Sequence, residues 1–294
     1  MNKGHVKRLD DGPAPEPAVE WMLCQALAGV WPADLHAENA AGLKALEERF
    51  IAYVGKALRE AKLRTNWGDG NEAYEQAVIS YARNLLSPSN QTFLADFTDT
   101  LRPFARAGLV NSITQTIIKL TAPGVPDIYQ GSEGLDFSLV DPDNRREPDF
   151  NSLLNGLSEL QKLTFLDAQG WQNGSVKQRV TSIVLRLRQE MTSLFKRGSY
   201  LPLVAQGERA RNLIAYGRTD ATNAIIVVTQ RHVFGETHAS FSVSGWEETK
   251  IKLPEMLGDR RYADVLTGRK FNFGAEIELA SVFEDGPVVV LSAQ

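Results

Sequence analysis

The stretch KLTAPGVPDIYQGSEGLDFSLVDPDNRREPDF, Lys119 to Phe150, decides how the fold of this chain is interpreted. An apolar-periodic helix ends at Ala122-Pro123-Gly124, and residues 125–129 are predicted to form a short strand. This strand leads into a loop that is dense in amide and charged side chains. Barrel enzymes present their site residues in this way, at the C-terminal ends of strands. The loop carries Gln130, Glu133, Asp136, Asp141, Asp143, Asn144, Arg145 and Arg146.

Residues 124–133, GVPDIYQGSE, resemble the eighth-strand segment of the alpha-amylase superfamily. Further matches narrow the resemblance to the maltooligosyltrehalose synthases within that superfamily. They cover Asn111-Ser112, Gln115-Thr116, LTAPGVPDIYQG at 120–131 and LVDPDNRR at 139–146. The similarity extends over most of the chain, including residues 198–203 and the strand-rich C-terminal part.

The resemblance implies a catalytic machinery that this sequence does not contain. Amylase-type enzymes use a nucleophile Asp, an acid/base Glu and a second Asp, which the family places at the ends of strands four, five and seven. The last lies in a His-Asp-Thr-Lys-Arg motif, and that motif is absent here. We therefore expect the chain to be the C-terminal portion of such an enzyme, beginning after the seventh strand and carrying no catalytic residue.

The expected fold class is α+β multidomain. Residues 1–197 are predicted to form a mainly helical remnant of a (β/α)8 barrel that includes the eighth strand. Residues 198–294 are predicted to form an all-β sandwich domain, because short apolar runs recur there between turn signals. These runs cover 213–215, 224–229, 241–243, 249–253, 262–266, 276–279 and 288–291.

Helices are predicted from apolar residues that recur at spacings of three and four. Pro103 is expected to interrupt the helical stretch around it. Small polar side chains inside the helix before Leu120, such as Thr114, are expected to bond locally or to face solvent. Asn71 is predicted to cap the helix that follows it. The other predicted helices span 17–31, 40–62, 89–100, 104–120, 151–168 and 176–196.

Composition excludes several classes of protein. A net charge of −4 leaves no basic surface for nucleic acid. No run of about 18 apolar residues predicts a membrane span, and residues 1–12 lack the apolar core of a signal peptide. A single cysteine, Cys24, excludes an internal disulfide and fits a reducing compartment. The predicted location is the cytoplasm, and Cys24 is predicted to be structural.

The resemblance implies that this chain lines the reducing-end side of a sugar-binding cleft. Glu133 is expected to orient its neighbours. The charged loop residues are expected either to hydrogen-bond sugar hydroxyls or to pin the loop, and the two arginines could instead hold the catalytic acids missing here. Trp67 either stacks on a sugar ring or packs its loop against the barrel. The candidate substrate-binding residues are Trp67, Tyr129, Gln130, Glu133, Asp141, Asp143, Asn144, Arg145 and Arg146.

The activity implied by the resemblance is an isomerisation. Such enzymes convert the reducing-end α-1,4 linkage of a maltooligosaccharide to an α,α-1,1 linkage by intramolecular transglucosylation, without a cofactor. The implied partners are the maltooligosaccharide and the upstream barrel portion of the same enzyme. No metal is expected: Asp141-Pro142-Asp143-Asn144 is similar to a calcium loop, but Arg145 and Arg146 follow where a ligand and a glycine are required.

Two other interpretations remain open. The chain could be a non-catalytic carbohydrate-binding module that uses Trp67, Trp171 and Trp246 as sugar platforms, provided that these rings are exposed. It could also be a self-contained hydrolase, although its candidate acids are crowded together whereas opposed carboxylates normally come from different strands. Those acids are Asp127, Glu133, Asp136, Asp141 and Asp143.

Overall fold

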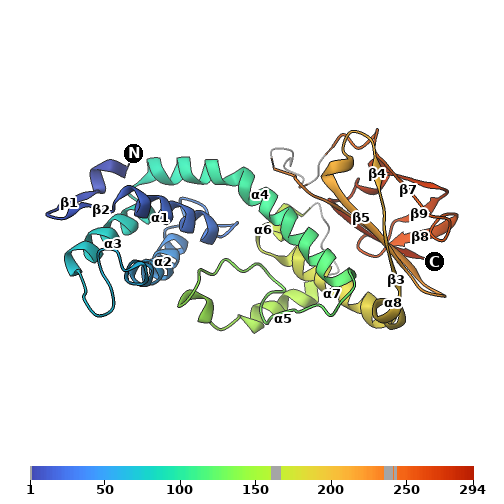
Figure 1. Cartoon of the computed structure of the whole chain (residues 1–294), viewed down its shortest axis with the longest axis horizontal. Coiled ribbons are helices and arrows are strands. Elements are labelled where there is room, and N and C mark those ends of the chain that lie inside the picture. Colours follow the sequence, from blue (N-terminus) through green and yellow to red (C-terminus); the bar gives the residue numbers. More distant parts are fainter. Residues whose placement is uncertain (1, 160–166, 235–240, 242–243) are drawn as a thin grey trace. The chain divides into compact units, whose positions relative to one another are not determined.

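The computed structural model describes residues 2–159, 167–234, 241 and 244–294, which form helices and antiparallel strands (Figure 1). Contacts divide the chain into two compact units. Unit 1 comprises Met1–Arg102 together with Asp136–Pro148, and unit 2 comprises Pro103–Leu135 together with Asp149–Gln294. Each unit is described by itself below.

Unit 1 consists of helices that each bury one face, together with a small hairpin. Pro17 occupies the first position of α1, where a missing N–H is tolerated because it would have no helical partner. The side-chain oxygens of Asn39 and Asn71 cap the next two helices by accepting N–H groups at 2.9 and 3.0 Å. These predicted helices are confirmed. The elements are η1 (Asn2–His5), β1 (Lys7–Leu9), β2 (Gly12–Ala14), α1 (Pro17–Val30), α2 (Ala40–Ala61), α3 (Glu72–Leu86), the start of α4 (Gln91–Thr121) and η2 (Asp143–Arg145).

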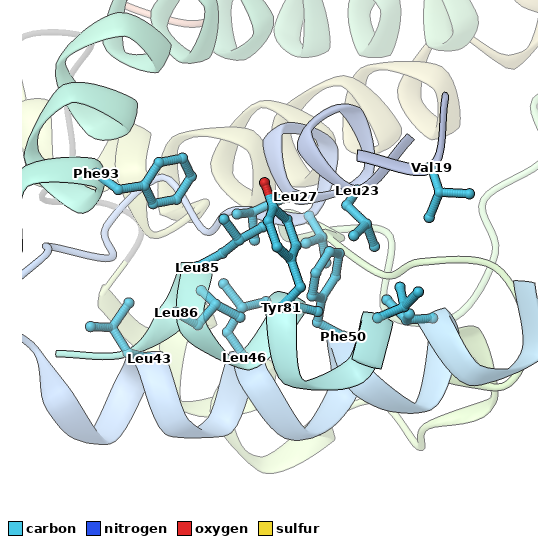
Figure 2. Close-up of a cluster of buried hydrophobic side chains, with 14 of the residues drawn as sticks. Val19, Leu23, Leu27, Leu43, Leu46, Phe50, Tyr81, Leu85, Leu86 and Phe93 are labelled. Atoms are coloured by element: carbon cyan, nitrogen blue, oxygen red, sulfur yellow. The ribbon is translucent and has the colours of Figure 1, made fainter. Parts of the chain in front are cut away.

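The core of unit 1 lies where α1, α2 and α3 meet. Figure 2 shows Leu27, Phe50 and Tyr81 pointing toward one another from the three helices. All three are buried, and burial of each such side chain stabilises the unit by about 1.5–3 kcal/mol. Tyr81 also places its hydroxyl on the carboxylate of Glu20, so its one polar atom is satisfied.

The helix α4 differs from its prediction. It runs without a break from Gln91 to Thr121, with Pro103 inside it. Proline removes one helical hydrogen bond and crowds the preceding turn, but it does not end a helix whose two flanks are both held by packing. On one side of Pro103, Leu94 is buried in unit 1, and on the other side Ile117 is buried in unit 2.

Replacing Pro103 with alanine is expected to raise the free energy of unfolding by about 2 kcal/mol. Alanine is favoured over proline by about 3 kcal/mol inside a helix, and the gain is partly offset because the unfolded chain becomes freer. Urea denaturation followed by circular dichroism measures the change. Gly108→Ala is the control, since a Cβ there meets nothing within 4 Å. If Gly108→Ala raised the free energy of unfolding and Pro103→Ala did not, α4 would depend on the proline for its stability.

Unit 2 combines helices with two antiparallel sheets. The larger sheet has the order β3-β5-β6-β11-β8-β9 and the smaller has the order β10-β7-β4. The strands are β3 (Ser199–Pro202), β4 (Ala205–Gln206), β5 (Leu213–Thr219), β6 (Ala224–Gln230), β7 (Lys250–Lys252), β8 (Arg260–Asp264), β9 (Lys270–Phe273), β10 (Glu276–Glu278) and β11 (Val288–Ala293). The helices are α5 (Phe150–Glu159), α6 (Ala168–Gln172), α7 (Ser175–Glu190), α8 (Thr192–Arg197), η4 (Ala210–Asn212) and α9 (Leu279–Val282).

Most of the predicted strands are confirmed. In the expected run 241–243, residues 242 and 243 lie outside the described residues, as do residues 160–166 of the predicted helix 151–168. The sequence did not predict β3, β4 or β9. Helix gives way to strand between Arg197 and Ser199, and the assignment of separate domains 1–197 and 198–294 stays a prediction.

The second half of α4 packs against the larger sheet within unit 2. The hydroxyl of Thr114 is buried and donates to the carbonyl of Gln230 at 3.0 Å, so the expectation that it bonds locally is wrong. The buried guanidinium of Arg218 on β5 donates to the carbonyls of Thr121, Leu194 and Gly198 at 3.1, 3.0 and 3.2 Å. These carbonyls lie at the ends of α4 and α8, where helices leave acceptors without partners.

The expected strand at residues 125–129 is not formed. Within the described part of the chain, no strand pairs with this segment. Val125 is 96% exposed and Tyr129 is 72% exposed. A barrel strand takes its hydrogen bonds from a neighbouring strand on each side, and the described residues provide neither, so the segment stays irregular.

Candidate functional site

The predicted site residues fall into two groups that the structure describes separately. Tyr129, Gln130 and Glu133 belong to unit 2. The other group belongs to unit 1 and consists of Trp67, Asp141, Asp143, Asn144, Arg145 and Arg146. The structure therefore describes two candidate surfaces, each of which is built below from its own unit.

Asp143 joins its loop to α2. Its side chain is 1% exposed, and both carboxylate oxygens accept from Arg49, at 2.9 and 2.8 Å. Arg146 and the backbone N–H of Leu139 donate to the same carboxylate at 2.9 and 2.8 Å. Arg49 also donates to the carbonyl of Phe137 at 2.6 Å. Such a bidentate, fully occupied carboxylate holds the loop in place and has no capacity left for a sugar hydroxyl.

The pKa of Asp143 reflects these contacts. Burial acts to raise the pKa. The hydrogen bonds from Arg49 and Leu139, with the charges of Arg49 and Arg146, outweigh burial and hold the pKa below its ordinary value. Of the roles that the sequence left open for the charged loop, the geometry of Asp143 and Arg146 favours pinning the loop.

Asp141 is placed differently, at the rim of a cavity. It forms ion pairs with Lys56 of α2 and with Arg145 of its own loop. The hydrogen bond from Lys56 is the largest influence on its pKa and lowers it; burial opposes this effect, and the charge of Arg145 adds to it. Because Asp141 is only partly enclosed, these pairs orient it without removing it from contact with solvent.

The cavity beside Asp141 has a volume of about 540 Å³ and is lined by α2, α3, Trp67 and the start of the charged loop. Trp67 is 59% exposed, and its Nε1 donates to Glu60 at 3.0 Å. The guanidinium of Arg59 lies 5.0 Å from the centre of its ring, and Arg59 is held in turn by Glu75 at 2.9 and 2.6 Å. Trp67 and Asp141, predicted separately, are thus brought to one cavity.

Lys56, Arg59 and Glu60 also line this cavity, but they were not among the candidate residues predicted from the sequence. Their spacing of three and four residues puts them on one side of α2. That spacing could have identified them as a group. The spacing could not have identified what these side chains face, because the rest of the cavity lining comes from other segments, including Asp141 and Pro142.

In unit 2, Glu133 lies at a smaller cavity of about 260 Å³ with an apolar lining that includes Phe150, Leu154 and Leu185. One of its carboxylate oxygens is buried without a hydrogen-bond partner among the described residues. Tyr129 is exposed. Asp127, one of the acids of the hydrolase alternative, is exposed.

The alternative of a carbohydrate-binding module loses two of its three platforms. Trp171 is 2% exposed and stacks on Phe241 at 4.6 Å, and Trp246 is 3% exposed beside Phe283. These two rings fill the interior of unit 2, so their predicted role as exposed sugar platforms is wrong. Only Trp67 of the three presents its ring to solvent.

No group of three or more His, Cys, Asp or Glu side chains in the described ranges could hold a metal ion. None of the helices in that part of the chain is long and apolar enough to cross a bilayer.

Comparison with known proteins gives consistent names. No model of a protein family matches the chain. A Mycobacterium tuberculosis (strain H37Rv) protein whose name includes "maltooligosyl trehalose synthase" is 33% identical over 288 residues, which is 98% of this chain and 33% of that protein. The structure of maltooligosyltrehalose synthase from Arthrobacter ramosus matches 96% of this chain and 33% of its own, with 33% identity and a TM-score of 0.73.

A third match is the DSM5389 glycosyltrehalose synthase, with 26% identity, a TM-score of 0.66, and coverage of 94% of this chain and 31% of that one. The chain therefore spans about one third of the length of the relatives that it matches. The resemblance recognised in residues 111–146 thus extends over nearly the whole chain, in sequence and in fold. This chain is similar, over nearly its whole length, to about one third of maltooligosyltrehalose synthase, an enzyme of the alpha-amylase superfamily.

Proposed function

We propose that this chain is the non-catalytic part of an enzyme that converts the reducing-end α-1,4 linkage of a maltooligosaccharide to an α,α-1,1 linkage by intramolecular transglucosylation. The observation that carries the proposal is the 33% identity over 98% of the chain. Retaining chemistry of this type needs two carboxyl groups about 5–5.5 Å apart. The catalytic motif of the seventh strand is absent from the sequence, so the catalytic acids come from the upstream barrel portion.

The unpaired segment at residues 125–129 supports the proposal that an upstream barrel portion completes this part of the enzyme. No described strand pairs with this segment, and its side chains Val125 and Tyr129 are exposed, so neighbouring strands could still add to it. We propose that the upstream portion supplies them, which completes the (β/α)8 barrel and sets Tyr129, Gln130 and Glu133 at its mouth. In the same proposal, residues 198–294 form a C-terminal β-sandwich, no cofactor takes part, and the enzyme works in the cytoplasm.

Complementation tests the proposal. The purified chain is incubated with maltopentaose alone, and then together with the preceding two thirds of the A. ramosus synthase. We expect no maltooligosyltrehalose from either piece alone and product from the mixture, measured by chromatography. The control is the A. ramosus enzyme divided at the matching position and recombined. Product from this chain alone would contradict the proposal. So would a silent hybrid mixture if the two A. ramosus pieces regain activity.

A further inference from the structure

Residues 125–129 have the exposure pattern of a strand, although no described strand pairs with them. The three odd-numbered residues are exposed, and the two even-numbered residues between them are half-buried. A period of two places alternate side chains on opposite faces, as extended backbone does. The segment ends at a turn, where the N–H of Ser132 donates to the carbonyl of Tyr129 at 3.1 Å. The side chains thus alternate as in a strand before any neighbour pairs with it.

One helix of the same unit, α7, holds the start of this segment. Arg188, near the C-terminal end of α7, donates to the carbonyl of Leu120 at 2.6 Å and to the carbonyl of Gly124 at 3.4 Å. Its guanidinium lies 4.6 Å from the centre of the Phe195 ring, which also fixes the side chain. Leu120 lies in the last turn of α4, where a helix leaves acceptors without partners. Gly124 lies beyond that helix, so the second contact fixes the backbone from which residues 125–129 begin.

The other end of α7 holds the end of the segment. The Nζ of Lys177 donates to the carbonyl of Gly134 at 2.8 Å. Gly174, the residue before α7, lies so close to Leu135 that an added Cβ would be 2.9 Å from the Leu135 nitrogen. A side chain at this position would therefore push the two backbones apart. Both contacts fix the point at which the segment leads into the charged loop.

The spacing of the two anchors agrees with this arrangement. Lys177 and Arg188 lie about three turns apart on α7, or about 16 Å along its axis. Five extended residues cover about the same distance, at roughly 3.3 Å each. All of residues 125–134 in extended form would cover about 33 Å. Anchors at this spacing let the first half of the segment extend and leave the second half to the turn at 129–132.

We propose that α7 positions residues 124–134 to receive strands from another polypeptide, with Arg188 and Lys177 as its positioning residues. The two side chains contact carbonyls at the ends of the segment, and no described strand occupies the backbone between them. Extended main chain is what such an edge binds, because ladder hydrogen bonds supply the affinity. An edge that is already held in place loses less conformational entropy on pairing. The identity of the partner, the upstream barrel portion, rests on the proposed function.

Proteolysis of the whole 294-residue chain tests the positioning directly. Chymotrypsin cleaves after aromatic residues, and Tyr129 in the middle of the segment is 72% exposed. Mass spectrometry follows cleavage of the bond between Tyr129 and Gln130. We expect Arg188→Met and Lys177→Met each to speed this cleavage about tenfold, because cleavage follows the population of locally opened states. Arg188→Lys and Lys177→Arg keep a donor, so their rates are expected to stay within about twofold of the unchanged chain.

The matched control is Arg186→Met, because Arg186 is an exposed arginine on the same helix. This variant is expected to be cleaved at the rate of the unchanged chain. Thermal melts of all variants separate a loss of anchoring from a loss of folding. Arg188 also donates to the end of α4, whereas Lys177→Met leaves that contact intact. Lys177→Met therefore decides the test if Arg188→Met melts at a lower temperature.

Titration with the upstream two thirds of the A. ramosus synthase tests what the positioning serves. For Lys177→Met, we expect the concentration of that piece giving half-maximal product to rise about tenfold, with product formation at saturation unchanged. Lys177→Arg is expected to restore the lower concentration. Equal cleavage of the anchor variants and the control would overturn the positioning role. Faster cleavage with an unchanged half-maximal concentration would overturn the role in receiving strands.

Failure of the proposed function gives a different result. In that case the unchanged chain forms no product with the upstream piece, although the divided A. ramosus enzyme regains activity. The identity of the partner then falls with the proposed function. The cleavage rates of the anchor variants still decide whether α7 holds residues 124–134.

Discussion

Replacing Asp143 with asparagine is expected to lower the free energy of unfolding of unit 1 by about 3 kcal/mol. Removing one partner of a buried ion pair costs about 3–5 kcal/mol, because the remaining charge stays buried without compensation. The lower end applies, since Arg49 retains 20% exposure and Arg146 lies largely in solvent. The loop 136–148, which Asp143 ties to α2, is expected to become the first site of proteolysis.

Urea denaturation and limited proteolysis measure the two effects. Glu147→Gln on the same loop is the matched control, because Glu147 is exposed and the substitution removes the same charge. Surface changes of this kind alter stability by about 0.5 kcal/mol or less. If both variants unfold at the same urea concentration as the unchanged chain, the Asp143 contacts do not stabilise unit 1.

The contribution of Asp143 is also expected to depend on pH in a defined direction. Its folded-state pKa lies below the ordinary value, so the folded state favours the ionised form. The stabilisation is therefore complete above the ordinary pKa of about 4 and is lost as the pH falls through the lower folded-state value. The difference in stability between the unchanged chain and Asp143→Asn is expected to be constant from pH 7 to pH 5 and to shrink below pH 4.

The second large effect is expected in unit 2, where Arg218→Met should lower the free energy of unfolding by about 3 kcal/mol. Arg218 is 2% exposed and satisfies carbonyls at the ends of α4 and α8. Hydrogen bonds to a charged group contribute about 1.5–3 kcal/mol each. The net loss is smaller than the sum of these hydrogen bonds, because the methionine variant no longer buries a charged guanidinium. That burial is also the main reason why the pKa of Arg218 is lowered.

Hydrogen exchange locates the expected damage. Amides in the last turn of α4 and in α8 should lose protection in Arg218→Met, while those of unit 1 keep theirs. Arg197→Met is the matched control, because Arg197 is an exposed arginine at the end of the same α8. Equal stability of the two variants would show that solvent or neighbouring groups satisfy these carbonyls when Arg218 is absent.

The local patterns of the sequence were sufficient for most elements. Spacings of three and four placed the helices 17–31 and 40–62, and Asn71 marked the start of α3, because periodicity and capping depend on residues close together in the chain. Short apolar runs between turn signals placed most strands of unit 2. They missed β9, where exposed and half-buried residues alternate on an edge strand.

Several outcomes depended on distant residues. The sequence motif named Asp143 but could not show its pairing with Arg49, 94 positions away. Trp171 and Trp246 have the aromatic side chain that a sugar-stacking site needs, yet the rings of Phe241 and Phe283 pack against them and both are buried. Pro103 predicts a helix break by its local chemistry, and packing on both sides overrides it.

By itself, the sequence determined the resemblance of this protein to the maltooligosyltrehalose synthases and most of its helices and strands, since motifs and periodicity lie in consecutive residues. Only the tertiary structure decided which charged groups are consumed in holding a loop and which line a cavity with Trp67. It also decided that residues 125–129 remain unpaired. The physical reason is the same in each case: burial and hydrogen-bond partners come from segments that fold together, and a strand needs neighbours that its own residues cannot supply.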